Sequence, residues 1–311
     1  MRFKEFAILP ISDVPPCVFL KGDRYWVKRA VDLLTQNVDD FDKSFASPPS
    51  SVLEGLDKAE SFPLLSEKRI VVLRDYAKIT DEDKAYLEKY SSNPLSTTVF
   101  VLVGDPFKTV KGYVEVDCSS FDRASVVEEV EGIMERLGCS VTTDASSALL
   151  DYCGEEMGKI SAECVKLSSY VGKGGVVDLP AVEECVTPDV NYKIYQIGEL
   201  VAKGKYVETY DLVEKLGVEP TVLLANLTKY YRNVFYAKIY KGGNAELADY
   251  LKIKTYPLTL ASKTARNYSP VALLNLLNLF YDLEYKVKSG ATTGEEAMEL
   301  AIAEAIERRK Y

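Results

Sequence analysis

The chain has 311 residues and an ordinary apolar fraction of 47%, so there is room for two or three domains with sizeable cores. Its formal net charge of −9 disfavours binding of nucleic acid by this chain alone, because affinity for phosphate comes largely from lysine and arginine. The sequence has no histidine, which excludes Ser-His-Asp and Cys-His catalysis, and its six cysteines are not at metal-binding spacing.

The first part of the chain alternates apolar strands with helices. Strands are predicted at residues 17–20, 41–46, 70–73, 98–103 and 113–116. Helices are predicted at 24–35, from 48 to about 61, at 80–90 and at 123–137. Asp23 is a suitable N-cap for the first of these helices. The alternation predicts an α/β domain at residues 1–138, with a parallel sheet flanked by helices.

After Gly138 the pattern becomes helical. The sequence pattern predicts only short helices at residues 143–185 and a linker at residues 187–189. From residue 192 onward the chain predicts amphipathic helices, the longest at 220–240, 270–288 and 294–309. We therefore expect a small helical domain at 139–188 and an all-α domain at 189–311.

No membrane segment is predicted. No apolar run reaches the roughly 18 residues that a transmembrane helix needs. The short apolar stretch near the N-terminus is broken by prolines, unlike that of a signal peptide. We expect a cytoplasmic protein with free thiols and no membrane partner.

The turn after the first strand lacks the features of a phosphate-binding loop. Such a loop has the pattern G-x-x-x-x-G-K-[ST]. Here the turn has one glycine, Gly22, no Gly-Lys pair, and the bulky Tyr25 and Trp26 where backbone amides would face phosphate. The strand at 70–73 is followed by a single acid, Asp75, instead of the acids that hold magnesium. We predict no nucleotide, cofactor or metal site and no catalytic residue.

An apolar segment with no evident structural purpose precedes the strand at 70–73. It reads SFPLLSEKR at 61–69 and places Phe62, Leu64 and Leu65 around a proline, where a helix must end. These side chains could pack beneath the sheet, as most Phe and Leu residues do. They could instead dock into a partner protein.

Taken in order, these features resemble the delta subunit of the bacterial DNA polymerase III clamp loader. The segments that carry the resemblance are FLKGD at 19–23, FPLLSEKRIVVL at 62–73, EEMGKISAECVKL at 155–167, LGVEPTVLL at 216–224 and YKVKSG at 285–290. They occur in the family's order over nearly the whole chain.

The resemblance implies three domains. These are an AAA+-like clamp-binding domain without a working P-loop at 1–138, a small lid-like helical domain at 139–188, and a helical collar for oligomerisation at 189–311. It also implies a non-catalytic subunit that binds and opens the sliding clamp (beta) for loading onto primed DNA during replication. The implied partners are the clamp, the tau/gamma and delta-prime subunits, and primed DNA within the assembled complex.

The family's clamp-contacting residues correspond here to Phe62, Leu64 and Leu65, with Leu65 in place of an aromatic residue. Two alternatives stay open. One is an AAA+-like NTPase with an atypical nucleotide loop, and the other is a helical scaffold protein with a decayed nucleotide domain. ATP binding by the isolated chain would favour the first alternative. Purification of the native protein without clamp or polymerase subunits would favour the second.

Overall fold

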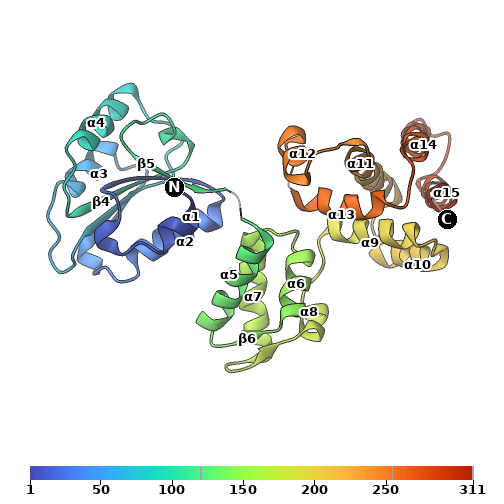
Figure 1. Ribbon diagram of the computed structural model, residues 1–311, viewed down its shortest axis with the longest axis horizontal. Helices are drawn as coiled ribbons and strands as arrows, with labels where there is room; N and C mark the ends of the chain where they lie inside the picture. Colours follow the sequence, from blue (N-terminus) through green and yellow to red (C-terminus); the bar gives the residue numbers. More distant parts are fainter. Residues whose placement is uncertain (120, 254, 310–311) are drawn as a thin grey trace. The chain divides into compact units, whose positions relative to one another are not determined.

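The structure is a computed structural model that describes residues 1–119, 121–253 and 255–309. The chain forms two compact units, Met1–Ser125 and Val126–Tyr311, each of which is described by itself (Figure 1). Among the described residues, no helix combines the length and the apolar character that crossing a membrane requires.

The first unit contains a five-stranded parallel sheet (Figure 1). The strands are β1 (Cys17–Gly22), β2 (Lys43–Ala46), β3 (Arg69–Leu73), β4 (Thr98–Val103) and β5 (Val114–Cys118), in the spatial order β2-β3-β4-β1-β5. Both β3 and β4 are buried along nearly their whole length. Their sequences are therefore continuous apolar runs instead of alternating ones.

Helices cover both faces of this sheet. They are α1 (Phe3–Ala7) and α2 (Arg24–Thr35) on one face, and α3 (Val52–Ala59) and α4 (Asp81–Ser92) on the other (Figure 1). Alternate residues of the strands, such as Val71 and Phe100, pack against α3 and α4 in one apolar core. The predicted α/β architecture is confirmed.

The predicted strand at 41–46 begins later than expected. Residues Asp40–Asp42 form a short 3-10 turn, η2, and only Lys43–Ala46 pair with β3. The side chain of Asp39 accepts a hydrogen bond from the N–H of Phe41 at 3.0 Å and thereby caps the turn. The predicted strand is therefore present only at Lys43–Ala46, and its buried residue is Ala46, whereas Phe45 is 43% exposed.

The first part of the second unit contains the helices α5 (Arg123–Arg136), α6 (Thr143–Tyr152), α7 (Met157–Val171) and α8 (Leu179–Cys185). The first turn of α5 precedes the division between the units. The prediction of helices only was wrong here, because β6 (Ser140–Val141) and β7 (Val176–Val177) form a parallel pair. Strands of two residues show no periodicity that a sequence pattern could reveal. The division between the units lies at Ser125, near the start of α5, whereas the sequence pattern placed a boundary after this helix.

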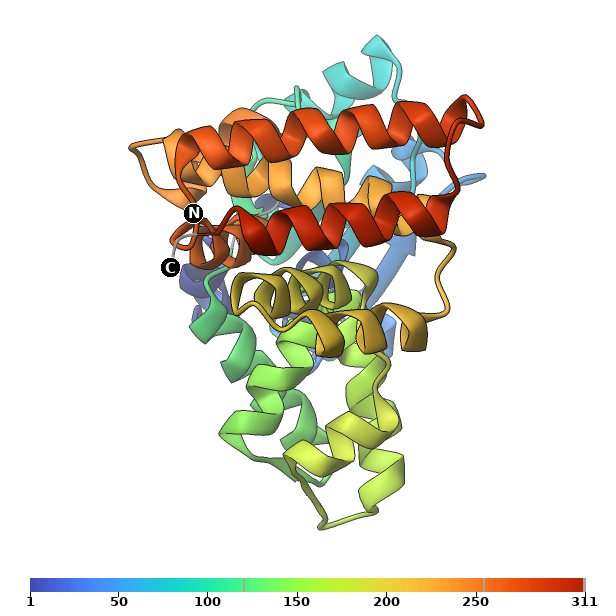
Figure 2. The ribbon, with the colours of Figure 1, turned by 90° about the vertical axis from the view of Figure 1, so that its right-hand side faces the viewer.

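The remainder of the second unit is all-α. Its helices are α9 (Val190–Ala202), α10 (Tyr206–Leu216), α11 (Pro220–Ile239), α12 (Asn244–Leu251), α13 (Thr255–Ala265), α14 (Pro270–Lys288) and α15 (Gly294–Glu307). Helix α11 packs against α9, α13, α14 and α15. Helices α14 and α15 lie side by side in Figure 2. The predicted helical C-terminal region is confirmed.

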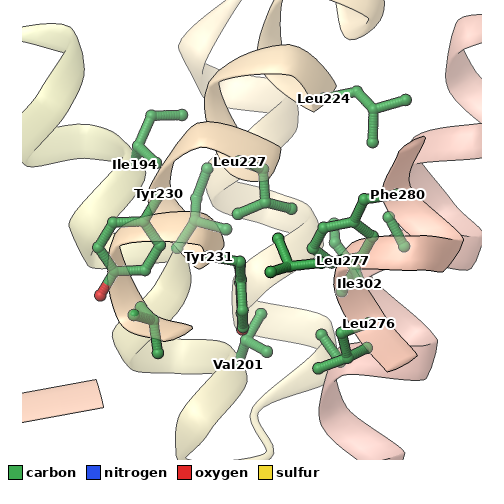
Figure 3. Close-up of a cluster of buried hydrophobic side chains, with 14 of the residues drawn as sticks. Ile194, Val201, Leu224, Leu227, Tyr230, Tyr231, Leu276, Leu277, Phe280 and Ile302 are labelled. Atoms are coloured by element: carbon green, nitrogen blue, oxygen red, sulfur yellow. The ribbon is translucent and has the colours of Figure 1, made fainter. Parts of the chain in front are cut away.

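The core of this helical region centres on α11. Figure 3 shows Leu227 and Tyr231 of α11 close to Phe280 of α14. The ring of Tyr231 meets that of Phe280 edge to face, with centroids 5.3 Å apart. The buried hydroxyl of Tyr231 has a partner, since it lies 3.0 Å from the hydroxyl of Tyr268.

Candidate partner-docking site

Phe62, Leu64 and Leu65 lie in the connection between α3 and β3, with their side chains in solvent. Their exposed fractions are 68%, 72% and 68%. The interpretation that they pack beneath the sheet is wrong, because side chains of α3 and α4 already fill the core on that face. These three residues are called the apolar knob below.

A buried carboxylate holds the backbone of the knob. The side chain of Asp42, at the end of η2, has no exposed surface. Its Oδ1 atom accepts a hydrogen bond from the N–H of Leu64 at 2.6 Å. Its Oδ2 atom accepts from the N–H groups of Leu65 and Ser66 at 2.8 and 2.7 Å. One carboxylate thus satisfies three consecutive amides of a connection that has no regular secondary structure.

The charge of Asp42 is stabilised in this position. Burial by itself would raise the pKa of its carboxyl group. The hydrogen bonds from the Leu64, Leu65 and Ser66 amides outweigh burial and lower the pKa from 3.8 to about 2. Arg69 adds a positive charge, with its Nη2 atom 3.5 Å from Asp42 Oδ1 and 3.3 Å from the carbonyl oxygen of Phe62, to which it donates. Asp42 is therefore ionised at neutral pH.

Further hydrogen bonds attach the C-terminal end of the knob connection to the unit. The Ser66 hydroxyl accepts from the N–H of Asp39 at 2.8 Å. The Lys68 ammonium is nearly buried and donates to the carbonyl oxygens of Ser12 and Val14 at 2.9 and 3.0 Å. Its burial lowers the pKa of Lys68. The apolar side chains are thus presented on a backbone that is already ordered, which reduces the entropy lost on docking.

Sequence reasoning did not identify Asp42. The alternation at 41–46 places Phe41 and Phe45 on one face and Asp42 and Ala46 on the other, and only the structure shows that the second face is the buried one. A carboxylate at an inward position needs several hydrogen-bond donors. The pattern did not indicate that these donors lie more than 20 residues further along the chain.

The turn after β1 is closed by the protein's own groups. Gly22 adopts φ +124°, and a Cβ atom there would lie 2.4 Å from the backbone carbon of Cys118. The Asp23 carboxylate accepts from the N–H groups of Tyr25 and Trp26 at 2.9 and 3.4 Å. In a phosphate-binding loop, amides at this helix start would face the phosphate. Here a side-chain carboxylate occupies that position.

The aromatic residue in the same turn is part of the core. Trp26 is buried and stacks on Phe121, with ring centroids 3.7 Å apart and planes within 13° of parallel.

Among the described residues, no group of three or more His, Cys, Asp or Glu side chains is arranged to hold a metal ion. All six cysteines are free thiols.

Comparison with known proteins identifies a matching family model, a similar sequence and a similar structure. Residues 191–305 match the model of a family described as the DNA polymerase III delta subunit, C-terminal domain. The DNA polymerase III subunit delta of Bacillus subtilis (strain 168) is 22% identical over 343 residues, covering 100% of this chain and 98% of that protein. The structure of a Bacillus subtilis DNA clamp loader delta protein covers 98% of each chain with a TM-score of 0.70 at 20% identity, which shows a common fold. The chain is therefore similar over its whole length to DNA polymerase III delta subunits, and its residues 191–305 match the C-terminal domain of that family.

Proposed function

We propose that the protein is a non-catalytic clamp-loader subunit that binds a sliding clamp through the apolar knob. The observation that carries the proposal is the exposure of Phe62, Leu64 and Leu65 on a connection held by Asp42. Similarity to DNA polymerase III delta subunits, and to a protein whose name describes a clamp loader, supports it.

The size of the knob suits an anchor. Burying one Phe or Leu side chain contributes about 1.5–3 kcal/mol, so the three together contribute about 4.5–9 kcal/mol. Association costs about 4–15 kcal/mol in lost translational and rotational freedom. The knob therefore needs additional contacts around it to form a stable complex.

Opening of the clamp requires a difference in affinity. A ligand shifts a conformational equilibrium only by as much as it prefers one state over the other. The knob would therefore bind the edge of an open clamp more tightly than that of a closed one. The tau/gamma and delta-prime subunits would join this chain through its C-terminal helices, and primed DNA would bind within the assembled complex.

The turn after β1 supports the proposal that the chain is non-catalytic. The Asp23 carboxylate accepts hydrogen bonds from the amides at the start of α2, and the Trp26 side chain is buried. ATP would therefore be bound by neighbouring subunits. The domain limits proposed are those of the sequence pattern, 1–138, 139–188 and 189–311.

Titration of the purified chain with its sliding clamp tests the proposal. The double variant Leu64→Ala/Leu65→Ala is expected to bind the clamp much more weakly than the native chain. Unchanged affinity would reject the knob as the binding site. Binding of ATP to the isolated chain at micromolar concentration would instead support the NTPase alternative.

A further inference from the structure

A fourth large apolar side chain is exposed next to the knob. Phe41, in η2, has 71% of its surface exposed, which is as much as the knob residues themselves. It immediately precedes Asp42, whose carboxylate accepts the amides of Leu64 and Leu65. The backbone of η2 and the knob connection are therefore held in direct contact.

The two neighbours Phe41 and Asp42 differ in exposure. Asp42 is fully buried and Phe41 is mostly in solvent. A fourth hydrogen bond, from the N–H of Asp39 to the hydroxyl of Ser66, joins the same two segments at 2.8 Å. Phe41 is thus fixed on a short, doubly attached turn instead of a free loop.

The surroundings of these apolar residues are polar. Asp40, Glu60 and Glu67 are exposed next to Phe41 or the knob in the sequence. Single exposed apolar residues are common on protein surfaces. Four of them on two joined segments, bordered by charged residues, have the composition of an interface with an apolar centre and a polar rim.

We infer that Phe41 is a fourth docking residue for the sliding clamp, and that Asp42 is a positioning residue that holds η2 and the knob together as one surface. The inference rests on the proposed function, because it takes the clamp as the partner. It predicts that the clamp offers an apolar surface that accepts an aromatic ring beside the leucines.

The role of Asp42 depends on its two oxygen atoms. Oδ1 and Oδ2 both accept hydrogen bonds from backbone amides. An asparagine has the same shape but only one oxygen, so its NH₂ group would face a backbone N–H. The variant Asp42→Asn should therefore release part of the knob connection while it leaves the apolar side chains in the sequence.

The experiment is a titration of the full-length chain with its sliding clamp. Phe41→Ala is expected to weaken binding about tenfold, as is typical of an aromatic residue in an interface. Tyr250→Ala, which removes an aromatic ring that is 80% exposed in the second unit, is the matched control and should bind like the native chain. Equal binding by Phe41→Ala and the native chain would overturn the role of Phe41.

Asp42→Asn is expected to weaken binding about tenfold or more by disordering the knob. The positioning role also predicts non-additivity: in the Leu64→Ala/Leu65→Ala background, Asp42→Asn should have little further effect on affinity. A purely structural defect would reduce binding equally in both backgrounds, and that result would overturn the positioning role. If Asp42→Asn does not fold, amide hydrogen exchange of the native chain tests the positioning role instead. Fast exchange of the Leu64, Leu65 and Ser66 amides would overturn that role.

The outcomes separate the inference from the proposed function. Loss of clamp binding in Leu64→Ala/Leu65→Ala together with native binding in Phe41→Ala rejects the fourth docking residue and keeps the proposed function. Native binding in Leu64→Ala/Leu65→Ala rejects the proposed function, and the inference fails with it.

Discussion

Truncation of the two knob leucines should leave stability almost unchanged and lower the affinity for the clamp. Leu64 and Leu65 are 72% and 68% exposed, so they bury little apolar surface on folding. The double variant Leu64→Ala/Leu65→Ala should therefore change the free energy of unfolding by less than about 0.5 kcal/mol. If docking buries both leucines, their loss should cost about 3 kcal/mol of binding free energy, which is about a hundredfold in Kd.

A core leucine gives the contrasting case. Leu102 of β4 has no exposed surface, so Leu102→Ala should lower the free energy of unfolding by about 2–5 kcal/mol. Denaturant unfolding measures the stabilities, and titration with the clamp measures the affinity. Val271→Ala, which truncates an apolar residue that is 68% exposed on α14, is the control for the binding assay.

The reasoning would be refuted in either of two ways. A loss of more than about 2 kcal/mol of stability in the knob variant would mean that the leucines are packed in the core. An unchanged Kd in a normally folded variant would mean that the clamp does not contact them.

The remaining predictions concern stability and follow from single positions. The pKa of Asp42 is lower in the folded chain than its ordinary value of 3.8, so its contribution to stability should be complete above about pH 4 and lost as the pH falls to about 2. The difference in unfolding free energy between the native chain and Asp42→Asn should shrink over that range. Gly22→Ala should destabilise the chain by more than about 1 kcal/mol, because of its positive φ and the backbone of β5 beside it. Gly158→Ala in α7, where a Cβ atom meets nothing within 4 Å, should instead stabilise it by about 0.5–1 kcal/mol in the same denaturant assay. Tyr231→Phe should cost about 1 kcal/mol, since it removes the hydrogen bond between the buried hydroxyls of Tyr231 and Tyr268, and thermal unfolding can measure this.

Local patterns predicted much of the fold. Helix α2 lies at Arg24–Thr35 and strand β4 at Thr98–Val103, as the sequence indicated. The cap of α2 was also predicted, since Asp23 accepts from amides two and three residues away. Such features depend on neighbours within a few residues, so a sequence pattern contains them.

The sequence by itself determined that the chain carries an apolar segment before β3, no P-loop pattern and no histidine. Only the tertiary structure decided that this segment is exposed and ordered, because its backbone amides find their acceptor in Asp42, more than 20 residues earlier. The structure also joined the turn that carries Phe41 to the knob connection, through hydrogen bonds of Asp39 and Asp42. Burial and hydrogen bonding between distant segments depend on how the strands assemble, and local sequence preferences do not encode that.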